Sequence, residues 1–115
     1  MRLNLEGKVF KPLSNSSNGE VSESTTFEYH QTGEIIFAYY SGGGILQGHL
    51  LGRMFADGHL EFSYHHLNDA LEIMTGNCTT YPEVGSDGRI ILHEKWQWTC
   101  RDFSKGESVL IEVRP

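Results

Sequence analysis

A glutamate and two histidines are the residues of this chain best suited to chemistry. His49 and His66 lie on either side of an Asp57-Gly58 dipeptide, and Glu94 lies in a later aromatic stretch. Burial raises the pKa of a carboxyl group and lowers that of an imidazole, so Glu94 and His66 would suit general acid–base catalysis, with His49 as a third candidate. Two imidazoles and a carboxylate also suit a divalent metal, but no second histidine-rich motif accompanies them, and we expect no metal and no cofactor.

Structural roles compete with catalytic ones for these residues. An ion pair between Glu94 and Arg53 would satisfy a buried carboxylate without any reaction. Nucleophilic catalysis is not indicated, because the chain contains no Gly-x-Ser-x-Gly motif. Its two cysteines, Cys78 and Cys100, fall on opposite faces of the predicted sheet, and we expect both to be structural thiols.

The Asp-Gly dipeptides predict how the candidate residues are positioned. Asp57-Gly58 separates two strand-like runs, which is a strong signal for a two-residue hairpin turn. Side chains alternate between the two faces of a strand, so this turn would bring His49 opposite His66 on one face. Asp87-Gly88 predicts a second hairpin of the same type. Carrying the alternation from strand to strand assigns every side chain to one face or the other.

One face of the predicted sheet collects aromatic and polar side chains. Its members are Tyr40, Gln47, His49, Arg53, Tyr64, His66, Asn77, Thr79, Tyr81, Glu94, Trp96 and Trp98. A pocket that binds a small, partly apolar or aromatic molecule has this composition: apolar walls with a few orienting polar groups. The alternative is a polar core whose groups satisfy one another. An enzyme of the isomerase, cyclase or hydrolase type, with Glu94 and His66 as acid and base, would use the same pocket.

The pattern of the chain predicts an all-β fold, because no segment keeps helical periodicity over ten residues. The predicted strands span about 3–10, 24–31, 34–41, 44–56, 59–68, 70–81, 89–100 and 107–113. Short turns join them into an antiparallel up-and-down meander of about eight strands, and closure into a barrel would remove the exposed edges. A two-sheet sandwich is the alternative. The turn-rich loop Pro12–Ser22 is either a lid or a mobile connection.

The opposite face of the predicted sheet carries an apolar patch. Its members are Ile35, Phe37, Tyr39, Leu46, Leu50 and Met54. An exposed patch of this kind indicates a partner surface, and a symmetric homodimer would cover it with its own copy. The alternative is that the faces are inverted and this set is the core.

The composition describes one domain, residues 1–115, large enough for a single core. A formal net charge of −6 argues against nucleic acid or an anionic membrane as the partner. No apolar run suits a signal peptide or a membrane span, so we expect a cytoplasmic location in which both cysteines stay reduced.

Four segments carry a resemblance to a family of small bacterial proteins without assigned function. They are Asn15–Ser22, Thr26–Gln31, Gly44–Tyr64 and Gly88–Thr99, the last reading Gly-Arg-Ile-Ile-Leu-His-Glu-Lys-Trp-Gln-Trp-Thr. The resemblance spans nearly the whole chain, and some members of that family are labelled N-acetylglutamate synthase. The predicted barrel is also similar to the calycin group, which includes lipocalins and fatty-acid-binding proteins and implies a ligand in the lumen. The lipocalin Gly-x-Trp motif is absent, and Gly7-Lys8-Val9-Phe10 stands there instead.

Overall fold

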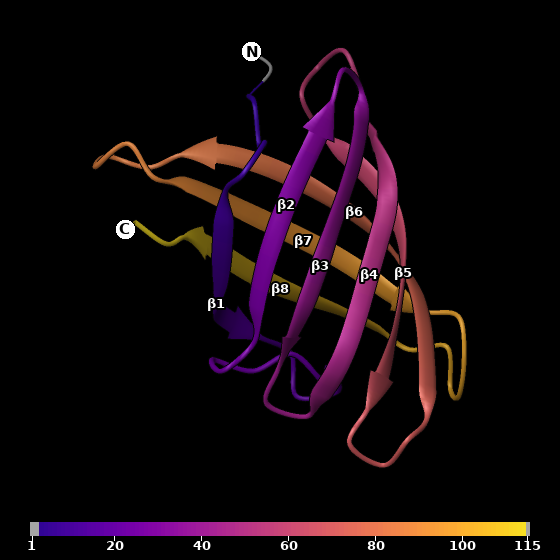
Figure 1. The fold of residues 1–115 in the computed structure, drawn as a ribbon. Coiled ribbons are helices and arrows are strands. Elements are labelled where there is room, and N and C mark those ends of the chain that lie inside the picture. The colour runs from indigo at the N-terminus through magenta and orange to yellow at the C-terminus, as the bar shows by residue number, and fades with distance from the viewer. Residues whose placement is uncertain (1–2, 115) are drawn as a thin grey trace.

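The computed structural model describes residues 3–114 as a closed antiparallel barrel (Figure 1). Its strands are β1 (Val9–Asn15), β2 (Thr26–Thr32), β3 (Ile35–Gly42), β4 (Ile45–Met54), β5 (Leu60–Asn68), β6 (Ile73–Val84), β7 (Ile90–Trp98) and β8 (Lys105–Glu112). Each strand pairs with the next one along the chain, and β8 pairs with β1 to close the barrel. The all-β meander and its closure are therefore confirmed, and the sandwich alternative is wrong.

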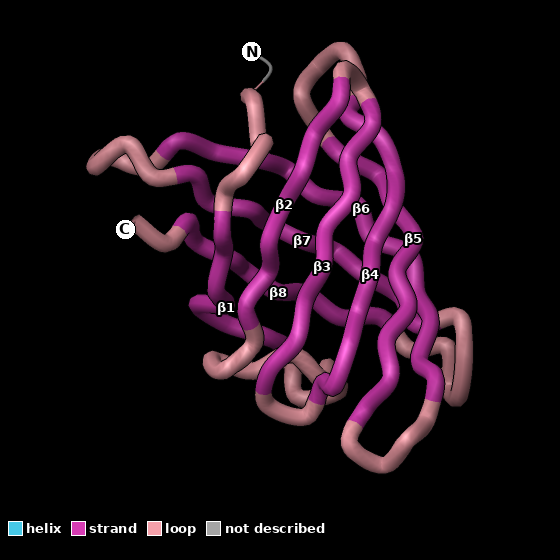
Figure 2. Tube along the Cα trace, in the orientation of Figure 1, coloured by secondary structure: helices cyan, strands magenta, loops and turns pink. Residues whose placement is uncertain are grey.

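The strands twist around a single interior, with β2 to β4 across the front of Figure 1 and β7 and β8 crossing behind them. Figure 2 shows only strands and loops for the part of the chain that is described. No helix long and apolar enough to cross a membrane occurs among those residues. Strand β7 illustrates why these segments are strands, because its residues from Ile90 to Trp98 alternate between the interior and the outer surface.

The two Asp-Gly turns each contain three loop residues, which corrects the predicted register. Phe55 N–H donates to the carbonyl of His59 at 2.8 Å, and Gly58 N–H donates to the carbonyl of Phe55 at 2.9 Å. Gly58 alone takes a positive φ, of 94°, so the loop is a type I turn followed by a glycine bulge rather than a two-residue turn. Phe55 therefore faces His59, which a two-residue turn would have paired with Ala56. The second turn, at Asp87-Gly88, has the same form.

The corrected turn reverses the two faces of β4. Leu50 and Met54, predicted on the outer surface, are buried in the core. Gln47, His49 and Arg53, predicted in the lumen, lie on the outer surface, and His49 pairs with His65 rather than with His66.

The faces of β6 are reversed for the same reason. The loop between β5 and β6 also has three residues, and it ends at Leu71 with a φ of 62°. As a result Asn77, Thr79 and Tyr81 lie on the outer surface, whereas Cys78 points into the interior.

Strands β3, β5 and β7 present the predicted faces to the interior. Phe62 and His66 of β5 and Trp96 and Trp98 of β7 are buried, as is Tyr40 of β3. The first strand differs from its predicted span, because the chain turns at Gly7, with a φ of 73°, before β1 begins.

Four of the interior aromatic residues pair across strands with a glycine. The pairs are Tyr40 with Gly48, Phe62 with Gly52, Tyr64 with Gly76, and Trp96 with Gly106. A Cβ atom at any of these glycines would overlap the paired residue or the backbone beside it. The glycines therefore let large side chains lie close against the barrel wall, which leaves space at the centre of the lumen.

Candidate functional site

The barrel encloses a small cavity near the end that the β1–β2 loop crosses, at the bottom of Figure 1. The space open to the centre of a water molecule has a volume of about 40 Å³. This volume is larger than the one that a single buried water requires. The lining residues are Asn15, Gly19, Glu20, Val21, Phe27, Tyr40, Leu50, Phe62, Tyr64, His66, Cys78, Glu94, Trp96, Trp98 and Ser108. The cavity thus combines an aromatic wall with a few polar groups.

Contacts between rings fix the aromatic wall. The rings of Trp96 and Trp98 meet edge to face with centroids 5.4 Å apart, and Tyr64 meets Trp98 at 5.9 Å. On the neighbouring part of the wall, Phe27 stacks on Tyr40 at 4.8 Å. Such contacts between buried rings stabilise one arrangement of the side chains, so the wall is formed before any ligand enters.

Glu94 is the buried acid of the cavity. Its side chain extends from β7 towards Ser108 on β8, and the Ser108 hydroxyl donates a hydrogen bond of 2.7 Å to Oε1. The residue is only 8% exposed. Burial disfavours the charged form and raises the pKa of Glu94 to about 7, although the Ser108 hydrogen bond acts in the opposite direction. Glu94 can therefore gain or lose a proton near neutral pH.

His66 lies at the centre of a hydrogen-bonded chain beside the cavity. Its Nε2 atom lies 2.8 Å from Oε1 of Glu20, and its Nδ1 atom lies 3.0 Å from the Tyr40 hydroxyl. An ionised carboxylate only accepts hydrogen bonds, so Nε2 donates to Glu20 and the other ring nitrogen of a neutral His66 accepts from Tyr40. Asn68 also donates to Glu20, at 3.1 Å.

The loop between β1 and β2 closes this end of the lumen. Besides the contact of Glu20 with His66, the indole N–H of Trp98 donates to the carbonyl of Asn18 at 3.0 Å. The side-chain amide of Asn15, the last residue of β1, donates to the carbonyl of Val21 at 2.8 Å and so connects the two ends of the loop. The loop therefore lies over the cavity and is attached to its wall through these hydrogen bonds.

A buried hydroxyl without a partner lies in the same interior. Tyr29 is completely buried, and among the described residues its hydroxyl makes no hydrogen bond. Burial is the main cause that raises the pKa of Tyr29, and the nearby Glu94 and Cys78 add to the effect. Leaving such a group unsatisfied costs about 1–3 kcal/mol, and in the described residues Tyr29 lies behind the cavity lining rather than in it.

A comparison with protein families decides which group of barrels this is. The model of the family described as Avidin-like protein matches residues 3–113. The chain belongs to the avidin-like family. Avidin-like barrels are known for binding small molecules, and the eight-stranded closure fits the calycin-like architecture. No curated protein matches the chain significantly.

Six of the predicted ligand-binding residues come together in this avidin-like barrel. They are Tyr40, Tyr64, His66, Glu94, Trp96 and Trp98. The candidate acid and base, Glu94 and His66, line the same cavity, whereas the third candidate, His49, lies outside it.

The remaining six predicted lumen residues lie on the outer surface of the avidin-like barrel. They are Gln47, His49, Arg53, Asn77, Thr79 and Tyr81. The His49 ring lies 5.3 Å from that of Tyr39 and 5.7 Å from that of His65. Arg53 binds Glu34 rather than Glu94, which removes the proposed structural ion pair. Within residues 3–114, no three histidine, cysteine or acidic side chains gather in a way that would hold a metal.

Sequence reasoning missed three polar residues of the cavity lining, Asn15, Glu20 and Ser108. Glu20 lies in a polar loop, where nothing in the pattern distinguishes it from Glu23. Ser108 had a weak signal, because it lies two residues before Leu110 and therefore shares the interior face of β8 with it.

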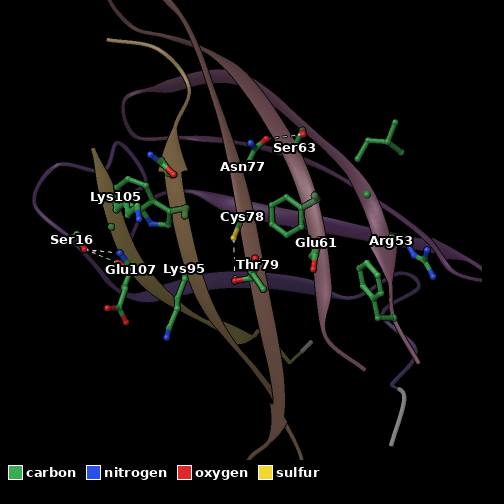
Figure 3. Close-up of a pocket in the computed structure, with 17 residues that line it drawn as sticks. Ser16, Arg53, Glu61, Ser63, Asn77, Cys78, Thr79, Lys95, Lys105 and Glu107 are labelled. Carbon is green, nitrogen blue, oxygen red and sulfur yellow. Dashed lines mark hydrogen bonds between the residues drawn. The ribbon is translucent and has the colours of Figure 1, made fainter. Parts of the chain in front are cut away.

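A second concavity lies on the outer surface over β4 to β8 (Figure 3). Arg53, Glu61, Lys95, Lys105 and Glu107 are exposed around it, and Figure 3 shows them spread over β4, β5, β7 and β8. This hollow is larger than the lumen cavity but open to solvent, so its charges are screened and its hydrogen-bonding groups are hydrated. The avidin-like lumen, with its buried acid, is therefore the candidate site.

Proposed function

We propose that this protein binds a small, partly apolar or aromatic molecule in the lumen, beneath the β1–β2 loop. One observation carries the proposal: a buried carboxyl group, Glu94, lines a cavity whose remaining wall is largely aromatic. Burying an acid in such surroundings is unfavourable for folding. A ligand that binds the carboxyl group in the cavity would offset this cost.

The size of the cavity limits the part of the ligand that is enclosed. With the loop closed, the lumen accommodates only a few non-hydrogen atoms beyond its own side chains. A larger molecule would enter by displacing the loop, which is held to the wall by the Glu20–His66 and Trp98–Asn18 hydrogen bonds. These two hydrogen bonds would break when a larger ligand enters, because they connect the loop to the residues that line the cavity.

Native mass spectrometry of freshly purified protein tests the proposal. We expect an added mass on the folded protein that is lost on denaturation and does not return when the protein is refolded in clean buffer. Filling the lumen with Leu50→Trp should remove the added mass, whereas Leu13→Trp, at an exposed position on β1, should keep it. A folded wild-type protein that carries no added mass and gains none in cell extract would contradict the proposal.

An enzymatic function in the same lumen is the second candidate. Glu94 can change its protonation near neutral pH, and His66 lines the same cavity with a hydrogen bond to Tyr40. An acid and a base in one cavity suit an isomerase, cyclase or hydrolase. An enzyme would convert the carried molecule to a product of different mass or retention time, and Glu94→Gln would prevent this. A pure binding protein would release it unchanged.

We also propose that the barrel associates with a second copy through the outer face of β3 and β4. Ile35, Tyr39, Leu46 and Leu51 are each about half exposed there, and Phe37 lies among them. Leu51 replaces Leu50 and Met54 of the predicted patch, both of which are in the core. Exposed apolar clusters on small domains mark association sites, and a two-fold axis would cover the patch with its own copy.

Sedimentation at high micromolar concentration tests this association. We expect a dimer for the wild type and a monomer for Leu51→Glu, because a buried unpaired charge opposes association. Leu13→Glu changes an equally exposed leucine on β1 and should leave the dimer intact. A monomeric wild type would show that the patch does not join two copies.

We propose a reducing, cytoplasmic location on the basis of the cysteines. Cys78 and Cys100 are separate thiols in the structure, and Cys78 is buried in the lumen wall. Alkylation of the unfolded protein taken directly from cells should modify both thiols, whereas a disulfide between subunits would protect one of them.

A further inference from the structure

Among the described residues, the lumen contains acidic side chains without matching basic ones. Glu94 lines the cavity and Glu20 borders it from the loop. Within residues 3–114, no lysine or arginine side chain is buried, so no fixed positive charge faces these two acids from inside. His66 is the one basic side chain in the described part of the lining, and its Nε2 atom is already bound to Glu20. Glu94 is therefore left with Ser108 as its hydrogen-bond partner.

The other groups around Glu94 are uncharged hydroxyls, a thiol and aromatic rings, and the Ser108 hydroxyl already donates to the carboxylate. The Tyr29 hydroxyl is buried without a partner, and it lies close enough to Glu94 to interact with it electrostatically. Aromatic side chains from β2, β3, β5 and β7 line the cavity. Aromatic rings attract cations through their negative faces, and the attraction is strongest where water is excluded.

We propose that the lumen ligand carries a primary ammonium group, which binds Glu94 inside the aromatic wall. This inference rests on the proposed lumen-binding function and names the chemical class of its ligand. The ammonium N–H groups donate to the Glu94 carboxylate, and the organic part of the molecule contacts the rings of Trp96 and Trp98, which line the same cavity. Neutralising the buried acid in this way removes the unfavourable burial of a lone carboxylate.

The inference predicts how binding depends on pH. The groups that face Glu94 are the hydroxyls of Tyr29, Tyr40 and Tyr64, the Cys78 thiol and the Ser108 hydroxyl, with the Glu20–His66 pair at the mouth of the cavity. Burial raises the pKa of each of these phenols and of the thiol, so they stay neutral between pH 6 and 8. Glu94, with a pKa raised to about 7, becomes charged over this range, and an ammonium ligand should bind about tenfold more tightly at pH 8 than at pH 6.

Three probes of equal size and different charge test the inference. Ethylammonium, ethanol and formate each have three non-hydrogen atoms, and they carry a positive, a zero and a negative charge. Each is titrated at constant ionic strength while tryptophan fluorescence and the unfolding temperature are followed. We expect ethylammonium to bind in about the millimolar range, which is near the limit for so small a ligand, and ethanol and formate to bind at least tenfold more weakly.

Variants assign the effect to Glu94. Glu94→Gln keeps the shape of the side chain and should weaken ethylammonium binding at least tenfold, while also removing most of the pH dependence. Glu107→Gln, at an exposed position next to Ser108 on β8, is the matched control and should bind like the wild type. The pH titration of the wild type needs no variant and supports the test if Glu94→Gln folds poorly.

The outcomes separate this inference from the proposed function. Ethanol or formate binding as tightly as ethylammonium, or unchanged ethylammonium binding in folded Glu94→Gln, overturns the ammonium ligand. In either case an added mass in native mass spectrometry would still support lumen binding. If none of the probes binds and the wild type carries no added mass, both the inference and the proposed function are wrong.

Discussion

Glu94→Gln should stabilise the unliganded protein at pH 8 by up to about 3 kcal/mol and change its stability little at pH 4. The pKa of Glu94 is raised from 4.5 to about 7 by burial, and a tenfold change in an ionisation equilibrium is worth about 1.4 kcal/mol. Between these two pH values the folded state binds a proton that the unfolded state has released. The contribution of Glu94 to stability is therefore fully present below pH 4.5 and is lost as the pH rises through about 7.

Urea unfolding of both proteins at several pH values measures this effect. The difference in the free energy of unfolding between wild type and Glu94→Gln should grow from pH 4.5 to pH 7 and then level off. The comparison cancels the surface carboxyls, such as Asp57 and Asp87, whose pKa values are lowered by hydrogen bonds and which titrate equally in both proteins. Glu107→Gln should show no such growth. A constant difference at all pH values would mean that Glu94 is not destabilised by burial.

The same measurement bears on the ligand. An ammonium group bound to Glu94 would favour the charged carboxylate in the folded state, so adding ethylammonium at pH 8 should recover part of the stability that the wild type loses between pH 4.5 and pH 7. Glu94→Gln should gain nothing from it. The instability of the empty site and the affinity for a cation would then have one physical origin.

The general form of the barrel could be predicted because alternation and turn residues act locally. Strands β3, β5 and β7 carry interior faces with large aromatic or aliphatic side chains, and these faces agree with the structure. Strands β4 and β6 were assigned the wrong faces, because an Asp-Gly dipeptide suits both a two-residue turn and a three-residue turn with a glycine bulge. In the three-residue form Asp57 and Asp87 each accept a hydrogen bond of 3.0 Å from the second residue after them.

A hydrophobic argument could have corrected β4 from the sequence. The predicted register buried the polar side chains of Gln47 and Arg53 and exposed the apolar side chains of Leu50 and Met54. Both are unfavourable, and the opposite register avoids both. No such argument reaches Glu20. Its contact with His66 joins positions 46 residues apart through a loop without periodicity, so only the folded chain brings them together.

The pairing of glycines with aromatic residues leads to the second large effect. Gly106→Ala should destabilise the protein by about 2–3 kcal/mol and abolish ligand binding in the lumen. A Cβ atom at Gly106 would overlap the six-membered ring of Trp96, which lies against this position on the neighbouring strand. A ring that yields towards the lumen would occupy the small cavity beside Glu94, which Trp96 already lines. Urea unfolding measures the first effect, and tryptophan fluorescence with native mass spectrometry measures the second.

Gly44→Ala is the matched control, because the nearest atom to its Cβ would be Asp69 Oδ2 at 3.7 Å, an ordinary contact. Trp96→Phe removes the part of the ring that meets Gly106, so the double variant Gly106→Ala/Trp96→Phe should be more stable than the sum of the single effects allows, by about 1 kcal/mol or more. Additive effects would show that the two residues do not constrain each other. A favourable coupling would show instead that the space in the lumen exists because Gly106 lets the Trp96 ring lie against the wall.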